Sequence, residues 1–138
     1  MPSHKTVMAF DYGTRRIGVA IGNSVAQTGQ ALKTVSQTNI DVRFQELAAL
    51  LKEWQPDQLV VGLPVHPDGT AHEMTAKSKR FGNQLHGRFQ LPVAWVDERY
   101  SSAVLEGDDK MRDNLDSHSA VLILEQYFAE ASAKTLDK

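Results

Sequence analysis

The feature that most limits the fold of this chain is a short, continuous apolar run at residues 59–63. Runs of this kind are typical of strands that are buried on both faces of a parallel sheet. The stretch before it, residues 40–54, repeats its apolar residues at helical spacing, and Pro56 ends it. The expected inward face of this helix carries Ile40, Phe44, Leu47, Leu51 and Trp54, and its other faces carry Asp41, Arg43, Gln45, Glu46 and Lys52. A helix that leads into a buried strand predicts an α/β fold.

Three strands are expected before this helix. Residues 6–10 alternate loosely, and Asp11 falls on the same face as the apolar residues two and four positions before it. Gly13 breaks this run, and residues 17–22 then form the second strand of a hairpin. A third strand is expected within residues 31–36.

Two more helices and one more strand are expected after the apolar run. Thr70 with Glu73 forms a capping-box signature, which opens a helix that ends at about Arg88. A strand at residues 93–96 follows, and the last helix starts near residues 116–117. The inward faces of these two helices are expected to carry Met74, Phe81 and Leu85 in the first and Ala120, Ile123, Leu124, Tyr127 and Phe128 in the second.

This order of elements predicts an α/β fold with a mixed five-stranded sheet, a three-stranded antiparallel meander plus two parallel strands, flanked by helices. A chain of 138 residues most often forms one domain, and residues 1–138 are expected to do so. Ligands of such sheets bind at the carboxyl ends of the parallel strands. The loop after Gly62 and the pair Asp97 and Glu98 are therefore expected on the same rim.

Composition excludes several classes of protein. The chain has 15 Lys plus Arg, 17 Asp plus Glu and no Cys, which excludes a disulfide scaffold, a zinc ribbon and a thiol nucleophile. A pI near 6.2 argues against nucleic-acid binding through bulk charge, so that a local basic patch or metal ions must carry any such role. The first apolar run is too short for a signal peptide or a membrane helix. We therefore expect a cytoplasmic protein with no membrane partner.

Four acidic residues stand where they could share one rim of the sheet. Asp11 ends the first strand, Asp97 and Glu98 end the strand at residues 93–96, and Asp116 precedes the last helix. Taken singly, each has a structural explanation, because Asp is common before Gly in turns and at the start of helices. Consecutive strand residues point to opposite faces, so only one of Asp97 and Glu98 shares the face of Asp11. Alternation alone leaves open which one.

Carboxylates from separate elements that converge on one rim repel one another unless a cation neutralises them. Oxygen ligands without Cys favour Mg²⁺ or Mn²⁺ over zinc. Two such ions roughly 4 Å apart can activate a water and stabilise the leaving oxygen of a phosphodiester displacement. The acidic residues therefore suggest the site of a metal-dependent nuclease, a hydrolase.

Four ordered motifs carry a resemblance to a known family. They are Phe10-Asp11-Tyr12-Gly13-Thr14-Arg15-Arg16-Ile17-Gly18-Val19-Ala20, Val61-Gly62-Leu63-Pro64 with Asp68-Gly69-Thr70, Asp97-Glu98-Arg99-Tyr100-Ser101-Ser102, and Asp116-Ser117-His118-Ser119-Ala120. The chain resembles the YqgF (RuvX) family over nearly its whole length. The resemblance implies an RNase H-like fold, processing of the 5′ end of pre-16S rRNA in ribosome biogenesis, and metal ligands at Asp11, Glu98 and Asp116. It is this resemblance that favours Glu98 over Asp97.

One segment departs from the family pattern. Between Arg99 and Asp116 the family usually carries a longer loop, with a Lys a few residues before the final Asp. Here the segment is short, and the basic residues Lys110 and Arg112 are followed by an extra acid, Asp113. How this loop positions substrate, and whether Asp113 or Asp97 also contributes to the metal site, stay open.

Basic residues near the acids are candidates for binding phosphate oxygens. They are Arg15, Arg16, Arg99 and Lys110, together with Lys77, Arg80 and Arg88, which fall with Gln84 along one strip of the second helix. Such a strip suits the backbone of a nucleic acid. The alternative readings are ion pairs with the same acids for the arginines and a solvated basic face for the strip.

Other functions remain open at this point. The family resemblance also implies Holliday junction resolution in DNA recombination and repair, which would need two sites in a symmetric dimer. Residues 11–14 are also similar to the first phosphate-binding segment of actin and sugar-kinase ATPases, although those need two such domains to enclose ATP. A binding module that keeps the acids only for folding would show no metal dependence. The sequence distinguishes neither RNA from DNA nor a monomer from a homodimer.

Overall fold

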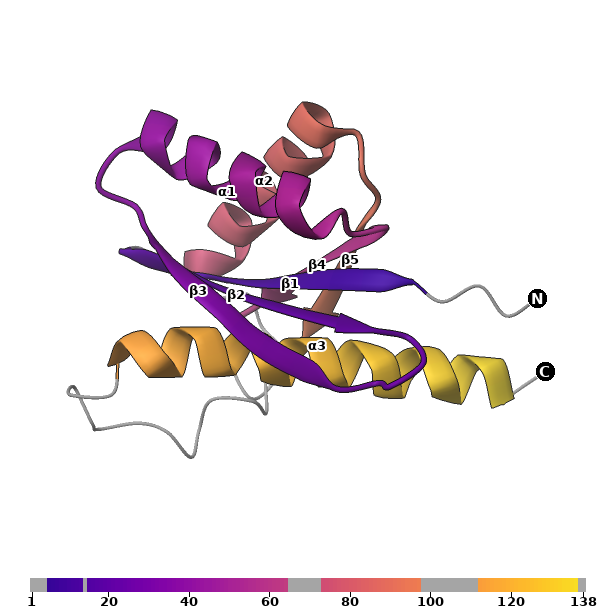
Figure 1. Ribbon diagram of the computed structural model, residues 1–138. Helices are drawn as coiled ribbons and strands as arrows, with labels where there is room; N and C mark the ends of the chain where they lie inside the picture. The colour runs from indigo at the N-terminus through magenta and orange to yellow at the C-terminus, as the bar shows by residue number, and fades with distance from the viewer. Residues whose placement is uncertain (1–4, 14, 65–72, 98–111, 137–138) are drawn as a thin grey trace.

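The computed structural model describes residues 5–13, 15–64, 73–97 and 112–136. The elements are β1 (Thr6–Tyr12), β2 (Arg16–Asn23), β3 (Gly29–Ser36), α1 (Ile40–Trp54), β4 (Gln58–Leu63), α2 (Glu73–Phe89), β5 (Val93–Asp97) and α3 (Arg112–Leu136). The strands form one sheet in the order β3-β2-β1-β4-β5. β1, β2 and β3 are antiparallel neighbours, and β4 is parallel to both β1 and β5. Helices α1 and α2 cover one face and α3 covers the other (Figure 1), which confirms the predicted mixed sheet.

Capping residues set the two ends of α1. The side-chain Oδ1 of Asn39 accepts hydrogen bonds from the backbone N–H groups of Asp41 (2.9 Å) and Val42 (3.2 Å), which satisfies two of the donors that a helix start leaves free. At the other end, Gln55 adopts a left-handed backbone with φ 46, and its N–H donates to the Leu51 carbonyl at 2.8 Å. Both ends of α1 therefore agree with the prediction.

Two side chains of α1 differ from the prediction. Trp54 is expected in the core but is 38% exposed, because it is the last residue of the helix and lies three positions beyond Leu51, where the core residues of α1 end. Arg43 is expected on another face but is only 5% exposed. Its guanidinium carbon lies 4.6, 5.8 and 5.9 Å from the ring centroids of Phe44, Phe81 and Tyr12. These aromatic rings, from three separate elements, cover the charge.

The last helix starts earlier than the sequence predicts. α3 begins at Arg112, whereas the apolar periodicity that predicts it begins only at Ala120. The polar residues of the first turns carry no such signal. For α2, Thr70 of the predicted capping box lies outside the described residues, and the helix begins at Glu73. No described helix is long and apolar enough to span a bilayer.

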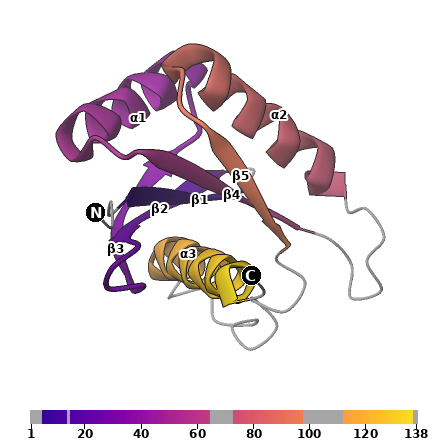
Figure 2. The same ribbon diagram turned by 90° about the vertical axis from the view of Figure 1, so that its right-hand side faces the viewer.

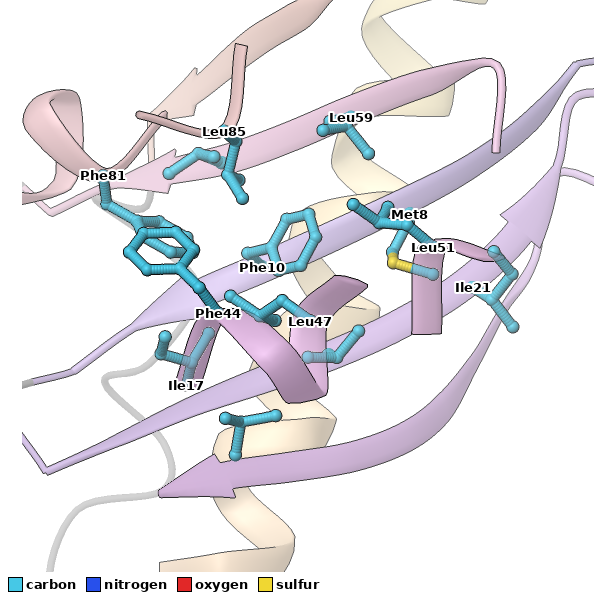
Figure 3. Close-up of a cluster of buried hydrophobic side chains, with 13 residues drawn as sticks. Met8, Phe10, Ile17, Ile21, Phe44, Leu47, Leu51, Leu59, Phe81 and Leu85 are labelled. Atoms are coloured by element: carbon cyan, nitrogen blue, oxygen red, sulfur yellow. The ribbon is translucent and has the colours of Figure 1, made fainter. Parts of the chain in front are cut away.

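Two hydrophobic clusters fill the two sides of the sheet. The first lies between the sheet and helices α1 and α2 (Figure 3) and takes Met8 and Phe10 from β1. Phe10 meets Phe81 of α2 edge to face, with ring centroids 5.8 Å apart. The second lies between the sheet and α3 and takes Val7 and Ala9 from β1. Even-numbered positions of β1 therefore face α1 and α2, and odd-numbered positions face α3.

The inward faces predicted for the other two helices are confirmed except at Met74, which belongs to neither hydrophobic cluster. Phe81 and Leu85 of α2 are buried in the first cluster, and Met74 is half-buried. In the second cluster α3 buries Ala120, Ile123, Leu124 and Phe128, with Tyr127 packed against them. The sheet is thus held between two helical layers.

Candidate active site

The candidate site lies at the edge of the sheet where the parallel strands β1, β4 and β5 end. Phe10 is paired with Val61 on β4, and Leu63 at the end of β4 is paired with Asp97 at the end of β5. α3 begins at the end of the molecule toward which β1 points (Figure 1). Asp116, near the start of α3, therefore belongs to a segment at the same end of the molecule as the tip of β1.

Asp11 occupies the α3 side of this edge. It continues the alternation of Val7 and Ala9, whose side chains pack under α3. Its backbone is paired with Gly18 of β2, and the residue is half-buried. A paired strand restricts the backbone of Asp11, and so this carboxylate is held on one face of the sheet.

Asp97 occupies the opposite face. Ala94 and Val96 of β5 pack toward α3, whereas Trp95 packs in the cluster under α1 and α2. Strand alternation places Asp97 with Trp95, on the side away from Asp11. Figure 2 shows β5 between the α1/α2 layer and α3. The structure thus separates Asp97 from Asp11, a point that the alternation of the sequence alone leaves open.

The remaining acids of the prediction are only partly described. Glu98 lies outside the described residues, as do Arg99 and Lys110 among the predicted basic residues. The backbones of Asp113 and Asp116 belong to α3, and their side chains lie outside the described part of the structure. Of the three predicted metal ligands, Asp11 is therefore the one whose face and burial are known.

The described part of the site can be tested for metal binding by its donor chemistry. Among the described side chains, no group of three or more His, Asp or Glu residues could hold a metal ion. Asp11 offers carboxylate oxygens, the hard donors that Mg²⁺ and Mn²⁺ prefer, at a half-buried place on the strand end. Asp11 therefore fits such an ion as one ligand of a larger set.

The predicted basic residues that the structure describes fall into two groups. Arg15 is exposed and Arg16 is half-buried at the start of β2, next to the turn that follows Asp11. Lys77 and Arg80 are exposed on α2, a separate element from that turn. Arg15 and Arg16 thus lie at the β1–β2 end of the site, and Lys77 and Arg80 lie on the helix that covers the face of the sheet opposite α3.

Arg88, the last residue of the predicted strip on α2, has a second contact. Its guanidinium carbon lies 3.9 Å from the centroid of the Phe44 ring on α1. This is the geometry of a cation–π interaction, in which the ring face attracts the charge. Arg88 therefore links α2 to α1 while remaining exposed.

Sequence reasoning missed one residue at the site edge. The amide Nε2 of Gln126 on α3 donates to the backbone carbonyl of Asp97 at 3.0 Å and to Glu130 Oε2 at 3.1 Å. It joins the end of β5 to α3. A glutamine on a helix is an ordinary surface residue in sequence, and no pattern singles it out.

The strand order β3-β2-β1-β4-β5 with helices on both faces, together with the acid at the end of β1, is that of the RNase H-like fold. The chain belongs to the RuvX family, described as Holliday junction resolvase, whose sequence profile matches residues 5–130. This agrees with the four motifs of the sequence and confirms the family to which they point.

Sequence relatives and a solved structure support this assignment. A protein of Polynucleobacter necessarius subsp. necessarius (strain STIR1), named "Putative pre-16S rRNA nuclease", is 73% identical over 125 residues, which cover 91% of this chain and 85% of the relative. A protein of the same name from Burkholderia vietnamiensis (strain G4 / LMG 22486) is 53% identical over 135 residues, with 92% and 91% covered. Thermus thermophilus RuvC in complex with a Holliday junction substrate superimposes with a TM-score of 0.55 at 13% identity, covering 93% of this chain and 96% of RuvC. At that identity the likeness to RuvC concerns the fold.

Proposed function

We propose that this protein is a metal-dependent nuclease that hydrolyses phosphodiester bonds in structured nucleic acid and processes the 5′ end of pre-16S rRNA in the cytoplasm. The observation that carries the proposal is the place of Asp11, on the α3 side of the edge where the parallel strands end. The printed names of the relatives supply the substrate.

Asp11, Glu98 and Asp116 would hold Mg²⁺ or Mn²⁺ in this proposal. The separation of Asp97 from the Asp11 face supports Glu98, because alternation permits only one of the two neighbours on that face. Asp116 would come from α3, which covers the same face. When bound, the metal ions supply an activated water and stabilise the charge on the leaving oxygen.

The chain's own residues would bind and orient the substrate. The paired strand restricts the backbone of the half-buried Asp11, and so its carboxylate is directed to the α3 face before substrate arrives. Arg15 and Arg16 would hold phosphate oxygens beside it, and Lys77, Arg80 and Arg88 would follow the nucleic-acid backbone along α2. Arg99 and Lys110, from the segment between β5 and α3, complete the proposed substrate-binding set.

Resolution of Holliday junctions is the second candidate. It is favoured by the description of the family and by the fold shared with RuvC. Two strands of a junction must be cut symmetrically, which requires two sites related by a two-fold axis. A homodimer is needed for this function, whereas a monomer can trim an rRNA end.

A cleavage panel tests the proposal. A precursor rRNA 5′ leader, a single-stranded RNA and a four-way DNA junction are each incubated with the protein and Mn²⁺ or Mg²⁺, with EDTA as the control. We expect cleavage of the rRNA leader that EDTA abolishes. Paired nicks in the junction alone, by a protein that sediments as a dimer, would favour the second candidate. Cleavage that survives EDTA, or no cleavage of any substrate, would contradict a metal-dependent nuclease.

The basic strip on α2 gives a prediction about salt. Lys77→Ala and Arg80→Ala are each expected to weaken binding of the rRNA leader. Each is also expected to reduce the magnitude of the slope of log affinity against log salt by about 1, because a protein with one phosphate contact fewer releases fewer counterions when it binds. The matched control is Lys79→Ala, an exposed lysine of the same helix but on another face. Fluorescence anisotropy at several salt concentrations measures the slopes. An equal change in all three variants would indicate net charge as the cause and not the strip.

A further inference from the structure

A buried arginine lies below the turn that joins β1 to β2. Arg43 of α1 is only 5% exposed, and its Nε has no hydrogen-bond partner among the described residues. The rings of Tyr12, Phe44 and Phe81 surround the guanidinium, all with centroids within 5.9 Å of its central carbon. Burying a charge is costly unless it is paired and hydrogen-bonded, so the burial of Arg43 costs free energy that its contacts must offset.

Arg43 makes one described side-chain hydrogen bond, and that bond leads to the turn. The Arg43 Nη1 donates to Oε1 of Gln37, which lies between β3 and α1. The Nε2 of the same Gln37 amide donates to the backbone carbonyl of Gly13. Gln37 thus connects the buried guanidinium to the turn that begins two residues after Asp11.

The arginine decides which way the Gln37 amide points. A guanidinium has only donors, and so it must face the carbonyl oxygen of the amide. The NH₂ group is then directed to the opposite side, where it can donate to the Gly13 carbonyl. A charged donor also polarises the amide and strengthens the bond that the amide makes on its other side. The buried Arg43 therefore orients the Gln37 amide so that its NH₂ group can donate to the β1–β2 turn.

The turn itself is closed by backbone bonds. The N–H of Gly13 donates to the Arg16 carbonyl, and the N–H of Gln37 donates to the Arg15 carbonyl, both at 2.9 Å. A Cβ at Gly13 would lie 2.8 Å from the Arg16 carbonyl oxygen, so the turn is tight. The two arginines proposed to hold phosphate oxygens, Arg15 and Arg16, belong to this turn and to the strand that leaves it.

We infer that Gln37 and Arg43 are positioning residues, which hold the β1–β2 turn so that Arg15 and Arg16 meet the phosphate backbone of the substrate. The inference rests on the proposed function, because it assigns these arginines to nucleic-acid binding. It goes beyond that function in placing the control of substrate binding in the buried Arg43 and its half-buried partner Gln37, with Arg43 on the α1 side of the sheet, the side opposite Asp11.

Gln37→Glu separates the positioning role from simple stability. The glutamate keeps an oxygen for Arg43 and gains an ion pair with it, but its carboxylate cannot donate to the Gly13 carbonyl. We expect a melting temperature at or above that of the wild type, and a KM for the rRNA leader raised about 5- to 10-fold, the equivalent of one lost hydrogen bond. The kcat is expected to stay within about twofold, which is the signature of lost uniform binding.

Two further variants control for charge. Gln30→Glu makes the same change in net charge at an exposed glutamine of β3 and is expected to keep the wild-type KM. Gln37→Met is neutral and removes both hydrogen bonds, so it is expected to raise the KM to a similar degree while also lowering the melting temperature. A raised KM in Gln37→Glu but not in Gln37→Met would show repulsion of the substrate by the new charge, and would overturn the inference.

Amide hydrogen exchange provides a readout that does not depend on activity. In Gln37→Glu the N–H groups of Gly13 and Gln37 are expected to exchange at least about tenfold faster, because opening of the turn becomes easier, while amides of the β1–β4 ladder keep their protection. Unchanged exchange at the turn would overturn the inference whether or not the protein cleaves RNA. If the wild type cleaves nothing while exchange at the turn accelerates in Gln37→Glu, the proposed function is wrong, but Gln37 and Arg43 still stabilise the turn.

Discussion

Asp11→Asn is expected to reduce metal-dependent cleavage of the rRNA leader by about 100-fold or more, whereas Asp97→Asn leaves it within about threefold. Even residues that only hydrogen-bond to a metal ligand cost about 10- to 100-fold in metal affinity or activity when they are removed, and a ligand itself is expected to cost more. Both substitutions replace a half-buried carboxylate at the end of a parallel strand with a neutral amide of the same shape. They differ in the face of the sheet that carries the side chain.

The comparison is sharpest when metal binding is measured beside activity. Mn²⁺ binding is measured by titration calorimetry or from the electron paramagnetic resonance signal of free Mn²⁺. It is expected to be weaker in Asp11→Asn and unchanged in Asp97→Asn. Circular dichroism checks that both variants fold. Loss of cleavage in Asp97→Asn, with Asp11→Asn still active, would place the metal on the α1/α2 face and contradict the proposed site.

The fold could be predicted from the sequence because its signals are local. The helical spacing in α1 and the apolar run in β4 each report on the faces that a segment buries, and the caps at Asn39 and Gln55 agree with them. The start of α3 could not be predicted, since its first turns carry no apolar periodicity. Local patterns thus determine the elements and their order, but not an end without such a signal.

The candidate site could be predicted only in part, because faces are a tertiary property. Alternation shows that Asp97 and Glu98 point to opposite sides, but which side is covered by α3 depends on how the helices pack. The burial of Arg43 had no signal either, since the rings that cover it come from β1 and α2 as well as its own helix. A charged residue in an amphipathic pattern is assigned to solvent unless such distant partners are known.

Two glycines of α2 are expected to respond to alanine in opposite directions. Gly82 is buried, and a Cβ there would lie 2.2 Å from a ring atom of Trp95 on β5. Overpacking of this kind costs about 1 to 3 kcal/mol, against a gain of about 1 kcal/mol in helix propensity. Gly87 is exposed, with nothing within 4 Å of the same Cβ position, so Gly87→Ala keeps only the gain.

Gly82→Ala is therefore expected to lower the free energy of unfolding by up to about 2 kcal/mol, and Gly87→Ala to raise it by about 0.5 to 1 kcal/mol. Urea denaturation measures both values. If the Trp95 ring is the cause, Gly82→Ala should cost less in a Trp95→Leu background, with a coupling of about 1 kcal/mol in the double-mutant cycle. A stabilised Gly82→Ala protein would mean that β5 and α2 stand further apart than the packing of Trp95 indicates, and the face assigned to Asp97 would lose its support.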